Sequence, residues 1–246
     1  MAETKPVVKK EENTAVIDYM AELQALTVAT TEAEKPSGNW ISFKSGILQV
    51  NGVAVKGNKI PVIMIHSMFE NQWYKNRYDP NNVQPPHCFA FAEKDEDLKP
   101  HPDSAEPQAD NCAECPKNAW GSDPDGGKGK ACKNVRRLAM IAATDLEEIA
   151  KAEVALAKLP VTSVKNWSSY ASQIGNVLKL PPLGVVTEMS VEPDARTQFQ
   201  VHFNLIDKVD PKHFPALLDK RRATTALMTV PYDKPVEPAA ATPKKF

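Results

Sequence analysis

The sequence of 246 residues has few cysteines and no long apolar segment. No run of 18 apolar residues occurs, which argues against a membrane-spanning helix. Only four cysteines are present, too few for a disulfide-dense scaffold in a chain of this length. Thirty Lys and Arg residues face 31 Asp and Glu residues, so the net charge of −1 gives no general sign of a polyanionic partner.

Signatures of the common enzyme classes are also missing. The sequence contains no His-Glu-x2-His, Gly-x-Ser-x-Gly, dinucleotide-binding or P-loop pattern, and its five histidines share no motif. We therefore expect a protein without catalytic activity. A metal-dependent nuclease stays open as an alternative, because its carboxylates can be scattered along the sequence.

The segment Met1–Glu12 is polar and charged, unlike a secretory signal. We therefore expect a cytoplasmic protein whose cysteines are free thiols or metal ligands. The content of 42% apolar and 25% charged residues fits one large domain, or a domain with an insertion.

Apolar periodicity predicts an α+β fold: a small, largely antiparallel β-barrel or sheet with peripheral helices and a long irregular insertion at about residues 86–137. Asn51-Gly52 predicts a tight hairpin. The predicted strands cover residues 40–44, 47–50, 53–56, 61–74, 137–143, 185–191 and 198–206, and the last two form an antiparallel pair.

Helical spacing predicts four helices, over residues 15–26, 145–159, 164–180 and 211–223. Residues 1–12 are predicted to be a flexible tail. Residues 229–246 are rich in Pro and Ala and are predicted to be disordered. The folded domain is then expected over residues 13–228.

The four cysteines form the most informative pattern in the sequence. Cys112 and Cys115 are a Cys-x2-Cys pair, Cys132 follows after sixteen residues, and Cys88 lies upstream. This spacing is typical of zinc ribbons, in which the thiolates surround one tetrahedral ion. A long irregular stretch such as residues 88–133 has no hydrophobic core of its own, and a bound metal can supply the missing stabilisation. We predict a structural Zn²⁺ held by Cys88, Cys112, Cys115 and Cys132.

Alternatives to this metal site remain at the level of sequence. His87 or His101 could replace Cys88 as the fourth ligand, since sites with three cysteines and one histidine are common. An iron–sulfur cluster could also use four cysteines, although zinc is the commoner occupant of ribbon spacing. Buried free thiols are the remaining interpretation.

Cations and aromatic residues gather around the cysteines. Such a mixture can neutralise phosphates and stack on bases, although a solvated rim and core packing are the simpler interpretations. The candidate nucleic-acid-binding residues are Trp73, Lys75, Arg77, Tyr78, Trp120, Lys128, Lys130, Lys133 and Arg136.

The region around the cysteines resembles a family of bacteriophage and prophage proteins associated with single-stranded DNA binding. Its plan is also similar to phage single-stranded DNA-binding proteins that carry a structural zinc in an OB-fold. This similarity implies an OB-like antiparallel β-barrel or sheet in which residues 86–137 form a zinc-binding insertion. The likeness covers roughly residues 86–140. It rests on Pro86–Phe89, Pro107-Gln108, Cys112–Ser122, Gly129–Lys133 and Arg136–Leu138. Many such proteins end in an acidic tail that recruits partners, whereas this chain ends Pro-Lys-Lys-Phe.

The resemblance implies non-catalytic binding and protection of single-stranded DNA during phage replication, recombination or repair, in the cytoplasm of a bacterial host. Replication or recombination proteins would be further partners. Two alternatives come from other classes: a metal-dependent nuclease or resolvase with a zinc module, and a zinc-stabilised protein–protein adaptor.

Overall fold

The computed structural model of the protein describes residues 19–23, 25–26, 39–79 and 81–233. The chain divides into two compact units, Met1–Gly38 and Asn39–Phe246. In the first unit, residues 19–23 and 25–26 are helical, in agreement with the predicted helix over 15–26. The rest of that helix, the predicted tail over 1–12 and residues 234–246 lie outside the described residues.

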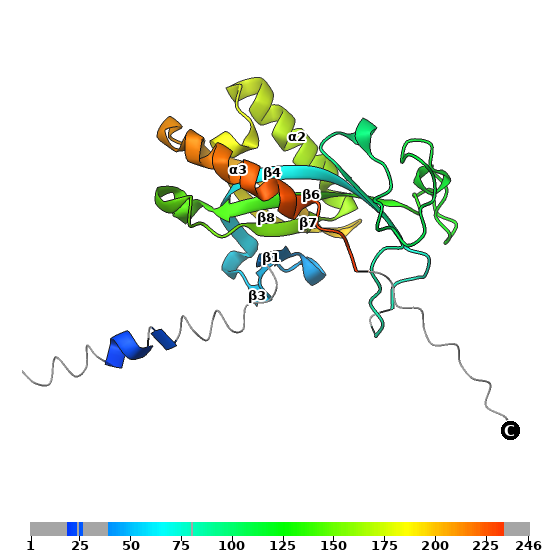
Figure 1. The fold of residues 1–246 in the computed structure, drawn as a ribbon, viewed down its shortest axis with the longest axis horizontal. Helices are drawn as coiled ribbons and strands as arrows, with labels where there is room; N and C mark the ends of the chain where they lie inside the picture. Colours follow the sequence, from blue (N-terminus) through cyan, green and yellow to red (C-terminus); the bar gives the residue numbers. More distant parts are fainter. Residues whose placement is uncertain (1–18, 24, 27–38, 80, 234–246) are drawn as a thin grey trace, which may run out of the picture. The chain divides into compact units, whose positions relative to one another are not determined.

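The second unit has an α+β fold built on one mixed sheet (Figure 1). Within its described residues, nine strands pair in the order β3–β2–β1–β7–β6–β4–β8–β9, and β5 pairs with β4. All pairs are antiparallel except β1 with β7. The strands are β1 (Asn39–Ser42), β2 (Gln49–Val50), β3 (Val53–Ala54), β4 (Lys59–Trp73), β5 (Cys88–Ala92), β6 (Lys133–Ala142), β7 (Ala155–Leu159), β8 (Val185–Asp194) and β9 (Gln198–Lys208).

Strand β4 explains why much of the sheet is apolar on both faces. Val62 and Met64 point into one buried cluster, while Ile63 and Ile65 point into another on the opposite face. A shift in the pairing with β6 follows, between Met64 and His66. The strand then continues to Trp73. At that end its two neighbours are β5 and β6, and the irregular segment connects these two strands.

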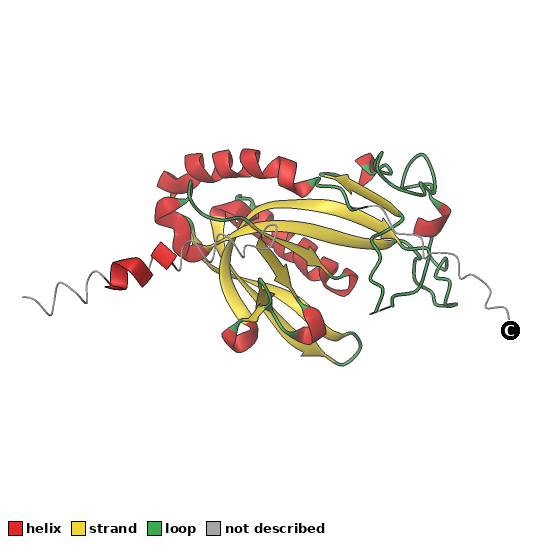
Figure 2. Ribbon diagram, turned by 60° about the horizontal axis from the view of Figure 1, so that its bottom comes forward, coloured by secondary structure: helices red, strands yellow, loops and turns green. Residues whose placement is uncertain are grey.

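The first buried cluster lies inside a curled sheet (Figure 2). Ile41 and Leu48 from one end of the strand order share this cluster with Val201 and Phe203 from the other end. Helix α2 (Val161–Leu178) closes it with Trp167, Tyr170 and Ile174. The sheet is therefore a half-barrel around one core, as its twist and bulges allow.

The opposite face carries a second buried cluster. Leu217 of helix α3 (Phe214–Met228) packs there with Ile63 and Ile65 of β4 and Ile141 of β6. The predicted helices over 164–180 and 211–223 are thus confirmed, as α2 and as α3 with a preceding 3₁₀ turn. Among the described helices, none combines the length and apolar character that crossing a membrane requires.

The predicted helix over 145–159 is wrong. Residues 143–148 form only 3₁₀ turns, and Ala155–Leu159 are strand β7. Strand β7 lies between β1 and β6, and its backbone pairs with both of them. Sheet pairing has overridden the helix preference of its Ala, Leu and Lys residues, because propensity is a weak local preference. The predicted strands are confirmed, with small differences at their ends. The stretch over 88–133 was predicted to be irregular, but its first residues, Cys88–Ala92, form strand β5 because they pair with β4.

Helix α2 also protects part of the outer edge of the sheet. Strand β9 is the last strand in the order, so one side of its backbone has no strand neighbour within the part of the chain that the structure describes. There the Val201 backbone N–H donates to Ser163 Oγ at 2.9 Å, and its carbonyl accepts from Asn166 Nδ2 at 3.0 Å. Two side chains of α2 thus satisfy backbone groups that would otherwise be exposed.

The segment after α3 stays with the fold as far as it is described. Arg137 donates to the carbonyl oxygens of Met228 and Val230, each at 3.2 Å. The Tyr232 hydroxyl donates to Glu70, which also forms a buried ion pair with Arg137 at 3.0 Å. The start of the predicted C-terminal tail is therefore held against β4 and β6.

Candidate metal centre and nucleic-acid interface

The register of the sheet places two cysteines on either side of the end of β4. Cys88 is the first residue of β5 and pairs with Trp73. Cys132 directly precedes Lys133, the first residue of β6, which pairs with Gln72. Two residues 44 positions apart in sequence therefore approach the same end of β4 from opposite sides.

Cys112 and Cys115 come from the irregular segment between β5 and β6, and short-range bonds fix their turn. The Cys112 N–H donates to the Leu98 carbonyl at 3.0 Å. Asn118 braces the turn twice, since its N–H donates to the Cys115 carbonyl at 2.9 Å and its Nδ2 to the Cys112 carbonyl at 2.7 Å. The Cys132 N–H donates to the Lys117 carbonyl at 2.8 Å, which joins the turn to the start of β6.

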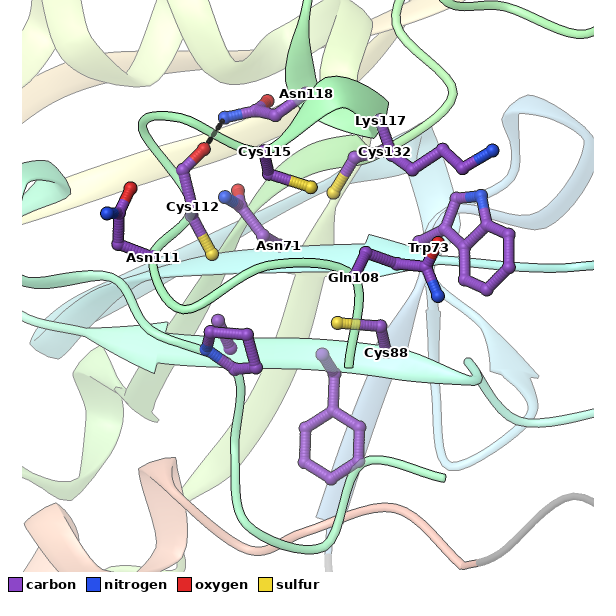
Figure 3. A pocket seen from close by; sticks show the side chains of 13 residues that line it. Asn71, Trp73, Cys88, Gln108, Asn111, Cys112, Cys115, Lys117, Asn118 and Cys132 are labelled. Atoms are coloured by element: carbon purple, nitrogen blue, oxygen red, sulfur yellow. Dashed lines mark hydrogen bonds between the residues drawn. The ribbon is translucent and has the colours of Figure 1, made fainter. Parts of the chain in front are cut away.

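All four cysteines line one small cavity of about 10 Å³. Figure 3 shows their sulfur atoms facing a common space between the turn and the strands. All four are free thiols; Cys88, Cys112 and Cys132 are buried, and Cys115 is half-buried. A volume of this size holds roughly one water-sized sphere, which is the scale of an ion rather than of an organic ligand.

Neither histidine considered as a fourth ligand lines this cavity among the described residues. The His87 ring packs edge-on to Trp73, with 6.1 Å between the ring centroids. His101 stacks on Phe89 at 5.0 Å and lies 3.6 Å from an Asp103 carboxylate oxygen. The geometry therefore favours Cys88 over either histidine.

Burial makes the thiols of this cavity hard to ionise. Burial, together with charge repulsion from neighbouring cysteines, raises the pKa of Cys88, that of Cys112 to about 11 and that of Cys132 to about 12. Thiolates in this cavity would thus need a compensating positive charge.

The residues present fit a thiophilic cation such as Zn²⁺, although they are not arranged around one. Among the described residues, no three or more His, Cys, Asp and Glu side chains form a group able to hold a metal ion as they stand. Two features support the fit: the four thiols are suitable metal ligands, and one buried nitrogen atom beside them lacks a hydrogen-bond partner. Asn71 is 3% exposed and lines the cavity, and its Nδ2 has no hydrogen-bond partner in the described structure. A buried N–H beside thiols suits a charged sulfur acceptor.

The predicted nucleic-acid-binding residues include two highly exposed aromatic rings. Trp120 is 80% exposed and Tyr78 is 77% exposed, values that are unusual for large rings. Lys130 Nζ lies 5.2 Å from the Trp120 ring centroid, a cation–π distance. Arg77, next to Tyr78, forms an ion pair with Asp125 and so ties the Tyr78 segment to the loop after Trp120.

Lys128 and Lys133 are also exposed. Lys128 lies in the loop over residues 121–129, which the Gly121 N–H closes by donating to the Gly129 carbonyl at 2.8 Å. Lys133 Nζ donates to the Lys130 carbonyl at 3.4 Å. The structure therefore gathers Trp120, Lys130 and Lys133 near the cysteine turn.

Other predicted contact residues have structural partners. The half-buried Trp73 lines the cysteine cavity, with Lys117 Nζ 5.4 Å from its ring centroid. Lys75 forms an ion pair with Glu106 at 2.7 Å. Arg136 stacks on Phe69 with 3.1 Å between the guanidinium carbon and the ring centroid, and burial lowers its pKa.

Sequence reasoning missed Asn71, Lys117 and Asn118. Lys117 and Asn118 follow the second cysteine of the Cys-x2-Cys pair, and that position could have marked them as part of the turn. Asn71 carries no such signal, because it lies in a strand and reaches the cavity only through the pairing of β4 with its neighbours.

Comparison of the chain with protein-family models, with curated proteins and with solved structures finds no match.

Proposed function

We propose that the protein binds single-stranded DNA without catalysis, through residues 116–133. A zinc ion bound by the cysteines would hold this segment in place. The observation that carries the proposal is the exposed Trp120 ring beneath Lys130, attached to the cysteine turn. An exposed ring next to a cation suits a base that stacks while its phosphate is neutralised.

The attachment runs through Asn118. Lys130 Nζ donates to Asn118 Oδ1 at 3.1 Å, and Asn118 Nδ2 donates to the Cys112 carbonyl. A metal ion that holds the cysteines in place would therefore also hold the Lys130 ammonium group over the Trp120 ring. A Zn²⁺ held by Cys88, Cys112, Cys115 and Cys132 would supply folding energy to this otherwise irregular region.

Stacking on Trp120 and Tyr78 would contribute about 1–3 kcal/mol per base, with little sequence preference. Lys128, Lys130 and Lys133 would neutralise phosphates. The curled sheet is compatible with an OB-like fold, and the resemblance around the cysteines points to the same binding class. A role in replication, recombination or repair of a phage genome within a bacterial cell follows from that resemblance.

The test is binding of a labelled single strand against competing duplex at two salt concentrations. We expect a preference for the single strand and a fall in log affinity of about 0.7 per neutralised phosphate for each unit of log salt. Trp120→Ala should weaken binding, whereas Trp40→Ala, a half-exposed tryptophan in β1, should have little effect. Equal affinity for duplex would refute the proposal, and cleavage of DNA with Mg²⁺ would favour a nuclease. No binding to either nucleic acid would favour an adaptor.

A further inference from the structure

Asn71 lies in the part of β4 that forms the wall of the cysteine cavity. Figure 3 shows its side chain among Cys112, Cys115 and Cys132. The side chain is buried, and its Nδ2 is one of two buried side-chain N or O atoms without a hydrogen-bond partner among the described residues. An unmet buried N–H is unfavourable, so this amide is suited to an acceptor that appears in another state of the site.

The orientation of this amide is fixed by a neighbour. Asn134 Nδ2 in β6 donates to Asn71 Oδ1, and the two residues are paired in the sheet. The oxygen of the amide is therefore occupied, and its NH₂ group is the part left to face the cavity.

Cys112 is a buried thiol that lines the same cavity as Asn71, and Figure 3 shows the two side chains beside each other there. We propose that Asn71 is a positioning residue of the metal site, whose Nδ2–H donates to the metal-bound Cys112 thiolate and holds it on the ion. This inference rests on the zinc site of the proposed function.

The physical reason is charge. Four thiolates around one divalent cation carry an excess of negative charge, which N–H donors to the sulfurs disperse. A donor on a central strand also couples the loop ligand Cys112 to the sheet. Loss of such an outer-shell partner typically weakens metal binding by 10–100-fold.

The test compares zinc affinity in Asn71→Leu with that of the parent protein, by competition with a chromophoric chelator under reducing conditions. We expect affinity to fall about 10–100-fold. Asn176→Leu is the matched control, because Asn176 is an exposed amide on α2 away from the cysteines, and it should bind as the parent does. Asn134→Ala, which frees the Asn71 amide, should give a smaller loss. Zinc affinity of Asn71→Leu within twofold of the parent would overturn the proposal.

A spectroscopic signature separates donation from mere packing and needs only the parent protein. In the ¹¹³Cd-loaded protein, a hydrogen bond to the thiolate should give a scalar coupling between the cadmium and the Asn71 side-chain amide protons. Absence of this coupling, with the amide signals assigned, would overturn the proposal even if Asn71→Leu failed to fold. A parent protein that binds no metal would overturn both the metal site and this role. Failure to bind DNA would refute only the nucleic-acid proposal, since neither measurement uses DNA.

Discussion

The buried ion pair between Glu70 and Arg137 should be the most sensitive electrostatic feature of the fold. The two side chains are 0% and 4% exposed. Arg137 Nε and Nη2 donate to the two Glu70 oxygens at 3.0 and 3.1 Å, which is a bidentate arrangement. Glu70→Gln keeps the shape of the side chain but leaves the guanidinium charge without a counter-charge.

Breaking a buried pair in this way costs about 3–5 kcal/mol, a large part of the roughly 5–15 kcal/mol that stabilises an ordinary domain. For a unit of this size, each kcal/mol lowers Tm by about 2–4 °C, so Glu70→Gln should lower it by about 6–20 °C. The assays are urea denaturation and thermal unfolding followed by circular dichroism.

The matched control is Glu188→Gln, which removes the charge from a partly exposed pair with Lys59 at 3.1 Å. It should cost less than about 1 kcal/mol. Glu70→Leu combined with Arg137→Met should be less destabilising than the sum of the two single changes, because neither partner then keeps an unpaired charge. The reasoning is refuted if Glu70→Gln costs no more than the control, or if the double variant is as unstable as the two single effects added together.

Three further predictions concern the metal, the DNA contacts and pH. Freshly purified, reduced protein should contain about one zinc per chain by elemental analysis, and Cys112→Ser should abolish it; a parent protein free of zinc would contradict the site. Replacing Lys130 and Lys133 together by Ala should flatten the salt slope of single-strand binding by up to roughly 1.4, whereas Trp120→Ala should keep the slope while weakening binding; an unchanged slope in the double variant would place the DNA path elsewhere. Thr197 Oγ1 and the N–H groups of Thr197 and Arg196 donate to Asp194, which lowers the pKa of its carboxyl group below its usual 3.8. The stability it adds is therefore present above the ordinary pKa of 3.8 and is lost as the pH falls through the lowered folded-state pKa. In denaturation curves, Asp194→Asn should be less stable than the parent at pH 7, and the difference should shrink as the pH falls below about 4. A difference in stability that is the same at pH 7 and at pH 2 would refute this.

Much of the sheet could be predicted because its signals are local. Asn51 and Gly52 adopt positive φ angles of 50° and 81°, as the Asn-Gly pair predicts for a tight hairpin between β2 and β3. The alternation in 185–191 and 198–206 predicted the β8–β9 pair for a similar reason. Strand β7 could not be predicted, because its strand state comes from pairing with β1 and β6 rather than from its own composition.

The candidate site could also be predicted from the sequence only in part. The spacing of Cys112, Cys115 and Cys132 pointed to one cluster, and the structure brings these residues to one cavity with Cys88. The roles of Asn71 and Asn118 depend on strand register and turn geometry, which the sequence does not show. Likewise, Arg136 and Arg137 are adjacent in a basic run, but alternation along β6 sends one to Phe69 and the other to Glu70.

The two bonds from α2 to Val201 also bear on self-association. An unprotected outermost strand is a template onto which another chain can add, and Phe199–Phe203 has the alternating apolar pattern that favours such growth. With Ser163 and Asn166 in place, an incoming strand finds both Val201 backbone groups already taken. Detachment of α2 would uncover this segment and the core beneath it together. Helix α2 therefore protects the β9 edge from the addition of a strand from another chain, as well as closing the core.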